Sequence, residues 1–193
     1  MKKVTGKRFC AYIVDYVIVA LIASLFARVP ILNPNYDKYM EEYNKYIESV
    51  KTSLNDSASD EIIDNSYTMT KLGVNITIIN LVVGAIYFVG FQYLNKGQTL
   101  GKKMLKIRMV DDNNERPKLY QVLIHSIIIN SLLTTTISVI TLLCLSKATY
   151  LNISEVVQII DMGLLFGSFG CMIVRKDGKG IHNILAHTNV IGE

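Results

Sequence analysis

Charged and protonatable side chains within long apolar stretches are the residues of this sequence best suited to chemistry. Asp15 lies inside the first such stretch, and Arg8, Tyr12 and Asp15 are spaced so that one face of a helix would carry all three. His125 and Asp161 lie inside two later apolar stretches. Because lipid exposure of a charged group costs several kcal/mol, we expect these side chains to face the interior of a helix bundle.

Two roles are open for such a buried polar set. Intramembrane carboxylates such as Asp15 and Asp161 mark ion and proton pathways. Alternatively, polar side chains bond to one another and fix helix packing. His125 and Asp15 lie at similar depths in their stretches, so we expect them to be in contact, and we expect Asp161 near the outer end of its helix. Further polar candidates are Asn80 and Asn130.

The elements that must position these residues are four apolar stretches, at residues 9–29, 73–94, 119–145 and 155–174. Each has about the 20 residues that cross a hydrocarbon core of roughly 30 Å. The first lacks a clear cleavage site, which favours a retained span over a cleaved signal peptide. The sequence therefore predicts an all-α membrane protein: one domain over residues 1–193, with four transmembrane helices arranged as two hairpins.

Lysine and arginine predict the orientation of these helices. They are frequent in 1–8, 95–118 and 175–193, whereas the loop at 30–72 has four Lys against eight Asp and Glu, and 146–154 has only Lys147. Basic segments stay on the cytoplasmic side. We therefore expect a multi-pass protein of the cell membrane with both termini in the cytoplasm and 30–72 outside.

The outer loop at 30–72 contains one predicted helix. Pro30 and Pro34 end the first span, and tyrosines at 36, 39, 43 and 46 recur at helical spacing opposite acidic side chains. This amphipathic helix either covers the outer end of the bundle or binds a partner. The stretch 55–60 is predicted to be a loop.

Two cytoplasmic segments share one pattern. Gly97, Gln98, Gly101 and Lys102 belong to a turn followed by a short basic helix whose apolar face would rest on lipid, and residues 106–110 resemble a strand ending in a turn at 111–114. In the tail, Gly180 and His182 open a helical turn before a strand-like 188–191. The Lys-Gly pairs at 96–97 and 179–180, 83 residues apart, suggest a weak internal repeat whose two strands pair.

Several kinds of site are not indicated. The three cysteines, Cys10, Cys144 and Cys171, have no paired spacing and are expected to be small buried apolar residues. No nucleophile–base set or phosphate-binding loop is present, which disfavours an enzyme. We expect no metal, no cofactor and no nucleic acid partner.

Three blocks of the sequence resemble the RDD family of membrane proteins: residues 7–15 (KRFCAYIVD), 97–111 (GQTLGKK followed by IRMVD) and 180–188 (GIHNILAHT). The chain departs from the family pattern where Asn183 replaces an Asp and His125 an Arg. The resemblance implies a transport role, including cation/proton antiport. It also implies that Arg8 and Asp15 are the leading functional residues, followed by Asp111 and the central block with Arg108.

Two functional hypotheses follow. In the first, the chain is a small transporter or transporter component, a homo-oligomer or partner of another membrane protein, in which Asp15 binds a cation or proton. In the second, it is a non-transport factor, such as an immunity, resistance or assembly protein, that acts through its tyrosine-rich outer helix. In both, lipids surround the chain.

Overall fold

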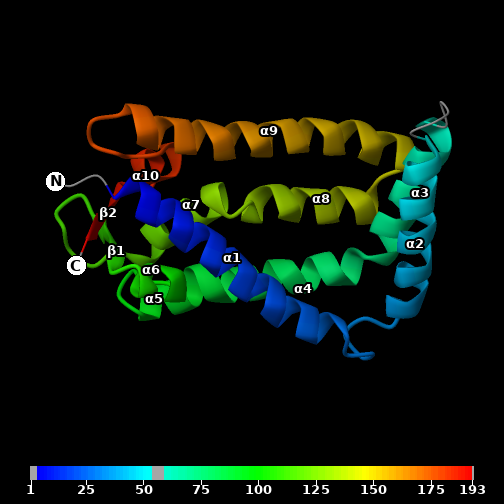
Figure 1. Cartoon of the computed structure of the whole chain (residues 1–193), viewed down its shortest axis with the longest axis horizontal. Helices are drawn as coiled ribbons and strands as arrows, with labels where there is room; N and C mark the ends of the chain where they lie inside the picture. Colours follow the sequence, from blue (N-terminus) through cyan, green and yellow to red (C-terminus); the bar gives the residue numbers. More distant parts are fainter. Residues whose placement is uncertain (1–3, 54–58, 193) are drawn as a thin grey trace.

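The computed structural model describes residues 4–53 and 59–192. Its long helices lie side by side, with both termini at one end of the bundle (Figure 1). Three helices are long and apolar enough to cross a membrane: α1 (Thr5–Ala27), the continuous helix Val74–Leu94, and α9 (Lys147–Val174). The pair α7 (Leu119–Ile129) and α8 (Leu132–Cys144) makes a fourth span if it is counted as one.

The third apolar stretch is not the single helix predicted over 119–145. Its two halves meet at an angle of 65° at Asn130 and Ser131. Ser131 adopts a left-handed conformation with φ of 55°, which ends the hydrogen-bond ladder of α7. The break was not predicted, because neither Gly nor Pro marks it.

The fourth apolar stretch begins earlier than the predicted 155. Helix α9 starts at Lys147, and Ser146 caps it by accepting a hydrogen bond from the amide of Thr149. Its 28 residues reach about 42 Å at 1.5 Å per residue, more than the hydrocarbon core requires. The predicted outer loop at 146–154 is therefore mostly helix, and Asp161 lies near the middle of α9 rather than near its outer end.

The second span contains a π-helical turn. Helix α4 (Val74–Ala85) continues through η1 (Ile86–Phe91) into α5 (Gln92–Leu94). A π turn leaves backbone carbonyls without their usual partners. One of them, Phe88 O, accepts a hydrogen bond of 2.9 Å from Ser126 Oγ, which joins the second span to α7.

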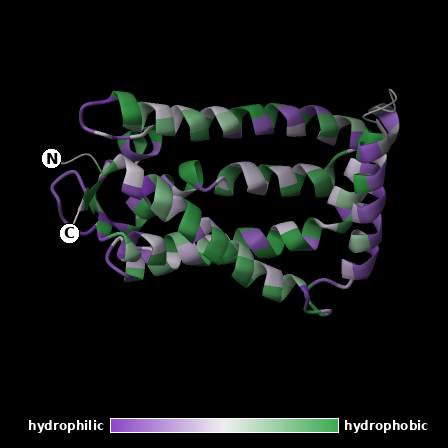
Figure 2. Cartoon of the chain, viewed as in Figure 1, coloured by the Kyte–Doolittle hydropathy of each residue, from purple (hydrophilic) through white to green (hydrophobic). Residues whose placement is uncertain are grey.

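The loop between the first two spans forms two helices, α2 (Tyr36–Ser53) and α3 (Ser59–Leu72), which lie across the end of the bundle opposite the termini (Figure 1). We call this the hairpin end; it is distinctly more hydrophilic than the spans (Figure 2). The helix over the tyrosines is confirmed. Helix α3 was not predicted, and the predicted loop at 55–60 is outside the described residues except for Ser59 and Asp60, which are helical.

At the opposite end, which we call the sheet end, lie α6 (Leu100–Met104), β1 (Ile107–Asp111), α10 (Ile181–Leu185) and β2 (Thr188–Gly192). The strands pair antiparallel, with Met109 opposite Val190, so the predicted pairing is confirmed. The repeat offset is 81 residues rather than 83: α6 and α10, and β1 and β2, start 81 apart, and the left-handed Gly97 and Gly178 match at that offset.

Burial is concentrated at the sheet end. Ile107, Met109 and Val122 are completely buried there, whereas Leu25, Ile159 and Phe166 on the spans are more than 60% exposed. An exposed apolar surface of this extent is what a bilayer covers. The expectation of buried cysteines is wrong, because Cys10 and Cys144 lie on this exposed surface and Cys171 is half-buried.

Candidate functional site

The Asp15 carboxylate lies on the buried face of α1 and holds the start of α6. It accepts three hydrogen bonds: from Tyr87 Oη (2.6 Å), from Thr99 Oγ1 (2.5 Å) and from the backbone amide of Gly101 (2.7 Å). Asp15 is only 2% exposed. The carboxylate thus joins α1, the π turn and α6, three elements distant in the sequence.

The sequence of α6 suits this contact. Thr99 caps the helix by accepting a hydrogen bond from the amide of Lys102 while its own hydroxyl donates to Asp15. A Cβ atom at Gly101 would lie 2.5 Å from Ala11 O and 2.8 Å from Asp15 Oδ1. Only glycine therefore lets α6 approach α1 this closely. The neighbouring turn needs Gly97, whose φ is 86° and whose Cβ would lie 2.2 Å from Met109 O.

Arg8 connects α1 to the C-terminal tail. Its Nη1 donates to the carbonyl of Gly178 (2.6 Å), and its Nη2 donates to the carbonyl of Val190 (2.8 Å) and to the side chain of Asn189 (3.1 Å). These acceptors are all uncharged. Among residues 4–53 and 59–192, Arg8 forms no ion pair, so its guanidinium orients the tail through hydrogen bonds rather than through a salt bridge.

His125 of α7 and His182 of α10 meet edge to face, with ring centroids 4.7 Å apart. They are 6% and 4% exposed. Burial lowers the pKa of His182 to about 3, and the nearby Arg8 and Lys102 charges lower it further in the same direction. His182 is therefore neutral at physiological pH, and its ring can donate only one N–H.

A cavity of about 50 Å³ lies between these groups. The structure brings seven of the predicted residues together around it: Arg8, Tyr12, Asp15, Lys102, His125, Asn130 and His182. The shared face of Arg8, Tyr12 and Asp15 is thus directed into the bundle as predicted. The predicted Asp15–His125 contact is not a hydrogen bond in the described structure, because the Asp15 oxygens are occupied by Tyr87, Thr99 and Gly101.

Lys102 differs from its prediction. The basic helix was expected to direct its lysines to lipid phosphates or water, but Lys102 lines the cavity, whereas Lys103 is exposed. Burial lowers the pKa of the Lys102 amine to about 8; the Asp15 charge raises it slightly and Arg8 lowers it. The short helix α6 therefore presents one lysine inward and the next one outward.

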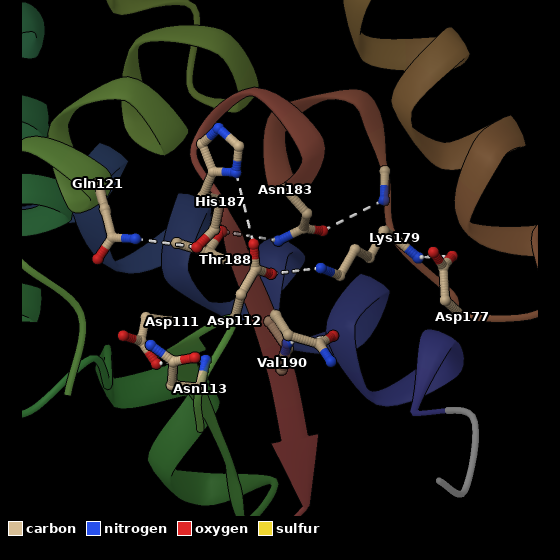
Figure 3. A network of polar contacts seen from close by, with 12 residues as sticks. Asp111, Asp112, Asn113, Gln121, Asp177, Lys179, Asn183, His187, Thr188 and Val190 are labelled. Carbon is tan, nitrogen blue, oxygen red and sulfur yellow. Dashed lines mark hydrogen bonds and ion pairs between the residues drawn. The ribbon is translucent and has the colours of Figure 1, made fainter. Parts of the chain in front are cut away.

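Figure 3 shows the polar contacts that hold the sheet end together. Asp112 binds Lys179 Nζ at 2.5 Å and His187 Nδ1 at 3.4 Å, which joins the β1 turn to the tail. The hydrogen bond from Lys179 lowers the pKa of Asp112, as does the contact with His187. The predicted functional residue Asp111 has a local role: its Oδ1 accepts from the amides of Asn113 and Glu115 and closes the turn.

The other central-block and tail residues also have structural positions. Gln98 Nε2 donates to the carbonyl of Ile107 (3.2 Å), and Arg108 lies on β1 opposite Ile191. Gly180 packs against the His182 ring, where a Cβ atom would lie 2.7 Å from Cε1. These residues shape the sheet end around the cavity.

Asp161 lies apart from that cavity, beside the break in the third span. Its carboxylate accepts hydrogen bonds from Ser131 Oγ (2.8 Å) and Thr134 Oγ1 (2.7 Å), the first residues of α8. The start of a helix carries partial positive charge, which favours a carboxylate there. Asp161 also lines a more open cavity of about 310 Å³ with Thr77, Thr135, Ser138 and Gln158. Asn80 lines a third cavity.

Sequence reasoning missed Tyr87, Thr99 and Gln92. Tyr87 and Gln92 lie in an apolar stretch, where a polar tip is a signal for an interior partner. Thr99 precedes a short helix with Leu-Gly-Lys-Lys, and threonine is a favoured N-cap residue. Among the described residues, no three His, Cys, Asp or Glu side chains come together as metal ligands.

The fold and these interior contacts define an α-helical membrane protein with a polar site enclosed at one end of its bundle. The chain belongs to the RDD family, whose family pattern matches residues 4–187, nearly the whole chain. No curated protein and no solved structure matches it.

Proposed function

We propose that this chain is a small membrane transporter, or the membrane component of one, that exchanges a cation for a proton at Asp161. The observation that carries the proposal is the break of the third span beside an intramembrane carboxylate: α7 and α8 meet at 65°, and Asp161 binds the first residues of α8. Interrupted helices whose ends face a charged group are typical of ion sites in transporters.

A series of polar cavities supports the proposal. Asn130 lines both the sheet-end cavity and the second cavity, of about 110 Å³, and Thr135 lines both the second cavity and the one at Asp161. The three cavities therefore follow the broken span from the sheet end toward the hairpin end. Carboxylate and hydroxyl oxygens line the last of them, and these are the ligands that alkali and alkaline-earth cations take.

The proposal places the exchange site at Asp161 rather than at Asp15. Three donors occupy the Asp15 carboxylate and attach it to α6. Asp161 has only two hydroxyl partners, each of which can rotate and instead accept a hydrogen bond, so its site can hold a proton or a cation.

The orientation and assembly are part of the proposal. Lysines and arginines cluster at the sheet end, which we place in the cytoplasm, so the hairpin end faces outward. Four spans enclose little space, and we propose that the chain works as a homo-oligomer or with a partner membrane protein.

The test is cation-dependent proton flux in proteoliposomes, followed with an internal pH-sensitive dye. We expect Asp161→Asn to abolish the flux while the protein keeps its fold, because an amide can bond to the same two hydroxyls. Glu155→Gln is the matched control, an exposed acidic residue on the same helix, and it should leave flux unchanged. Absence of flux in the unmodified protein, or normal flux in Asp161→Asn, would refute the proposal.

The alternative is a non-transport membrane factor that acts through α2. One observation favours it: α2 and α3 are held firmly on the bundle, with Tyr67 of α3 against Tyr150 of α9 at 5.7 Å and Lys147 paired with Asp64. This presents the acidic side chains of α2 at the hairpin end. Replacing Asp37, Glu41 and Glu42 by their amides should abolish such an activity while Asp161→Asn leaves it intact; the reverse result favours transport.

A further inference from the structure

The sheet-end cavity has an excess of positive charge that the proposed transport at Asp161 does not use. Arg8 and Lys102 both line it, and Asp15 is its one acidic side chain. Within the described part of the chain, neither Arg8 nor Lys102 forms an ion pair. Two cationic groups therefore share a small enclosed space with a single carboxylate.

The Asp15 carboxylate does not pair with either cation. It accepts its hydrogen bonds from a phenol, a hydroxyl and a backbone amide. The Arg8 Nη atoms bind backbone and side-chain oxygens of the tail, and its buried Nε has no partner among the described residues. Buried charged donors without a partner are costly, which indicates that a further acceptor completes the site.

The two histidines add unmatched nitrogens. His125 Nδ1 and His182 Nδ1 are buried without a hydrogen-bond partner in the part of the chain that is described. Both rings line the cavity. A neutral imidazole carries one N–H donor, so each ring is able to direct a proton toward an acceptor in this space.

We infer that the sheet-end cavity binds a small monovalent inorganic anion such as chloride, held by Arg8 and Lys102 and by N–H groups of His125 and His182. A cavity of about 50 Å³ accommodates such an ion with a few water molecules. The adjacent Arg8 and Lys102 charges disfavour a cation there. The same small volume disfavours the phosphate ester of a lipid headgroup, which has the same charge but a larger size.

The helix α6 offers a matched pair of variants for the test. Lys102 lines the cavity and Lys103, its neighbour, is exposed. Removing the Lys102 charge takes away a charged partner of the anion, and we expect chloride binding to weaken on the order of tenfold. Lys102→Arg keeps the charge and should retain binding, which separates a loss of charge from a loss of packing.

The measurement is excess line broadening of chloride in ³⁵Cl NMR, with detergent-solubilised full-length protein at fixed sodium concentration and gluconate as the replacement anion. We expect broadening in the unmodified protein, in Lys103→Met and in Lys102→Arg, with suppression by added bromide. Lys102→Met should reduce the broadening to that of empty micelles while still eluting as folded protein.

Three results would overturn the inference. The first is the absence of bromide-sensitive broadening in the unmodified protein. The second is equal broadening in Lys102→Met and Lys103→Met. The third is a stoichiometric phospholipid in extracted protein that Lys102→Met loses, which would assign the site to a lipid headgroup. None of these results depends on flux at Asp161, so the anion site and the transport proposal fail independently.

The pH dependence of chloride binding gives a second readout. The Lys102 amine, with its pKa near 8, faces Arg8 and Asp15 of α1, His125 of α7 and His182 of α10. Because the anion binds the protonated amine, binding should weaken as pH rises through about 8. In Lys102→Arg this weakening should disappear, and its persistence there would exclude Lys102 as the cause.

Discussion

The backbone amide of Gly101 donates a hydrogen bond of 2.7 Å to the carboxylate of Asp15, across 86 residues of sequence. This contact sets the distance between α1 and α6. The lining of the sheet-end cavity depends on it, because Asp15 and Lys102 come from these two helices. The predictions below start from this contact and then move outward through the fold.

Asp15→Asn should destabilise the protein by about 1.5–3 kcal/mol, because a charged acceptor of buried hydrogen bonds is lost and an amide N–H is placed against existing donors. Thermal unfolding in detergent measures the loss. Glu155→Gln, an exposed carboxylate change, should unfold at the same temperature as the unmodified protein. Equal stability of Asp15→Asn would mean that the three contacts do not hold α6.

Gly101→Ala should cost about 1–3 kcal/mol, because its Cβ would lie 2.5 Å from Ala11 O and forces α6 away from α1. Gly170→Ala is the control, since a Cβ there meets nothing within 4 Å. Unfolding temperatures of the two variants give the comparison. A Gly101→Ala protein as stable as Gly170→Ala would contradict the close approach.

Arg8→Lys should loosen the tail although the charge is kept. A lysine amine lacks the planar fork that reaches Gly178 and Val190 at once. Hydrogen exchange should become faster across β2 while the middle of α1 stays protected. Arg175→Lys, which alters an exposed arginine paired with Asp177, should leave β2 exchange unchanged.

The neutral His182 should make the fold sensitive to acid. Its pKa is about 3 in the folded chain and 6.5 in the unfolded chain, so the unfolded state takes up its proton first. Stability is therefore lost as pH falls from 6.5 toward 3. His182→Gln should flatten this part of the stability–pH curve, as followed by thermal unfolding, whereas His187→Gln at an exposed site should not.

Gly73→Ala should displace α2 from the start of α4, because its Cβ would lie 2.8 Å from Tyr39 Cε2. Faster hydrogen exchange in α2 would report the displacement. Replacing Tyr39 by Ala in the same protein removes the clash, so the double variant should exchange no faster than Tyr39→Ala alone. Additive effects of the two changes would contradict this packing.

The apolar stretches predicted the spanning helices because length and hydropathy are local properties. The helical spacing of Arg8, Tyr12 and Asp15 also predicted their common direction, since helix geometry alone decides it. Strand pairing between 107–111 and 188–192 followed from two short patterns of the same kind.

The break at Ser131 and the early start of α9 were not predictable in this way. A left-handed serine carries no strong sequence signal, and a polar first turn of a helix resembles a loop. Helix α3 was missed for the same reason. Its Asp, Asn, Ser and Thr residues are weak helix formers, and packing against α2 and α9 supplies what intrinsic propensity does not.

The sequence by itself determined an apolar membrane chain of the RDD type and the residues that must avoid lipid, because the cost of burying charge in hydrocarbon depends on residue type alone. Only the tertiary structure decided what each polar group contacts. It attached Asp15 to Gly101, placed Lys102 and His182 around one cavity and separated Asp161 from them. Hydrogen-bond partners depend on atomic distances between segments far apart in sequence, and packing alone sets those distances.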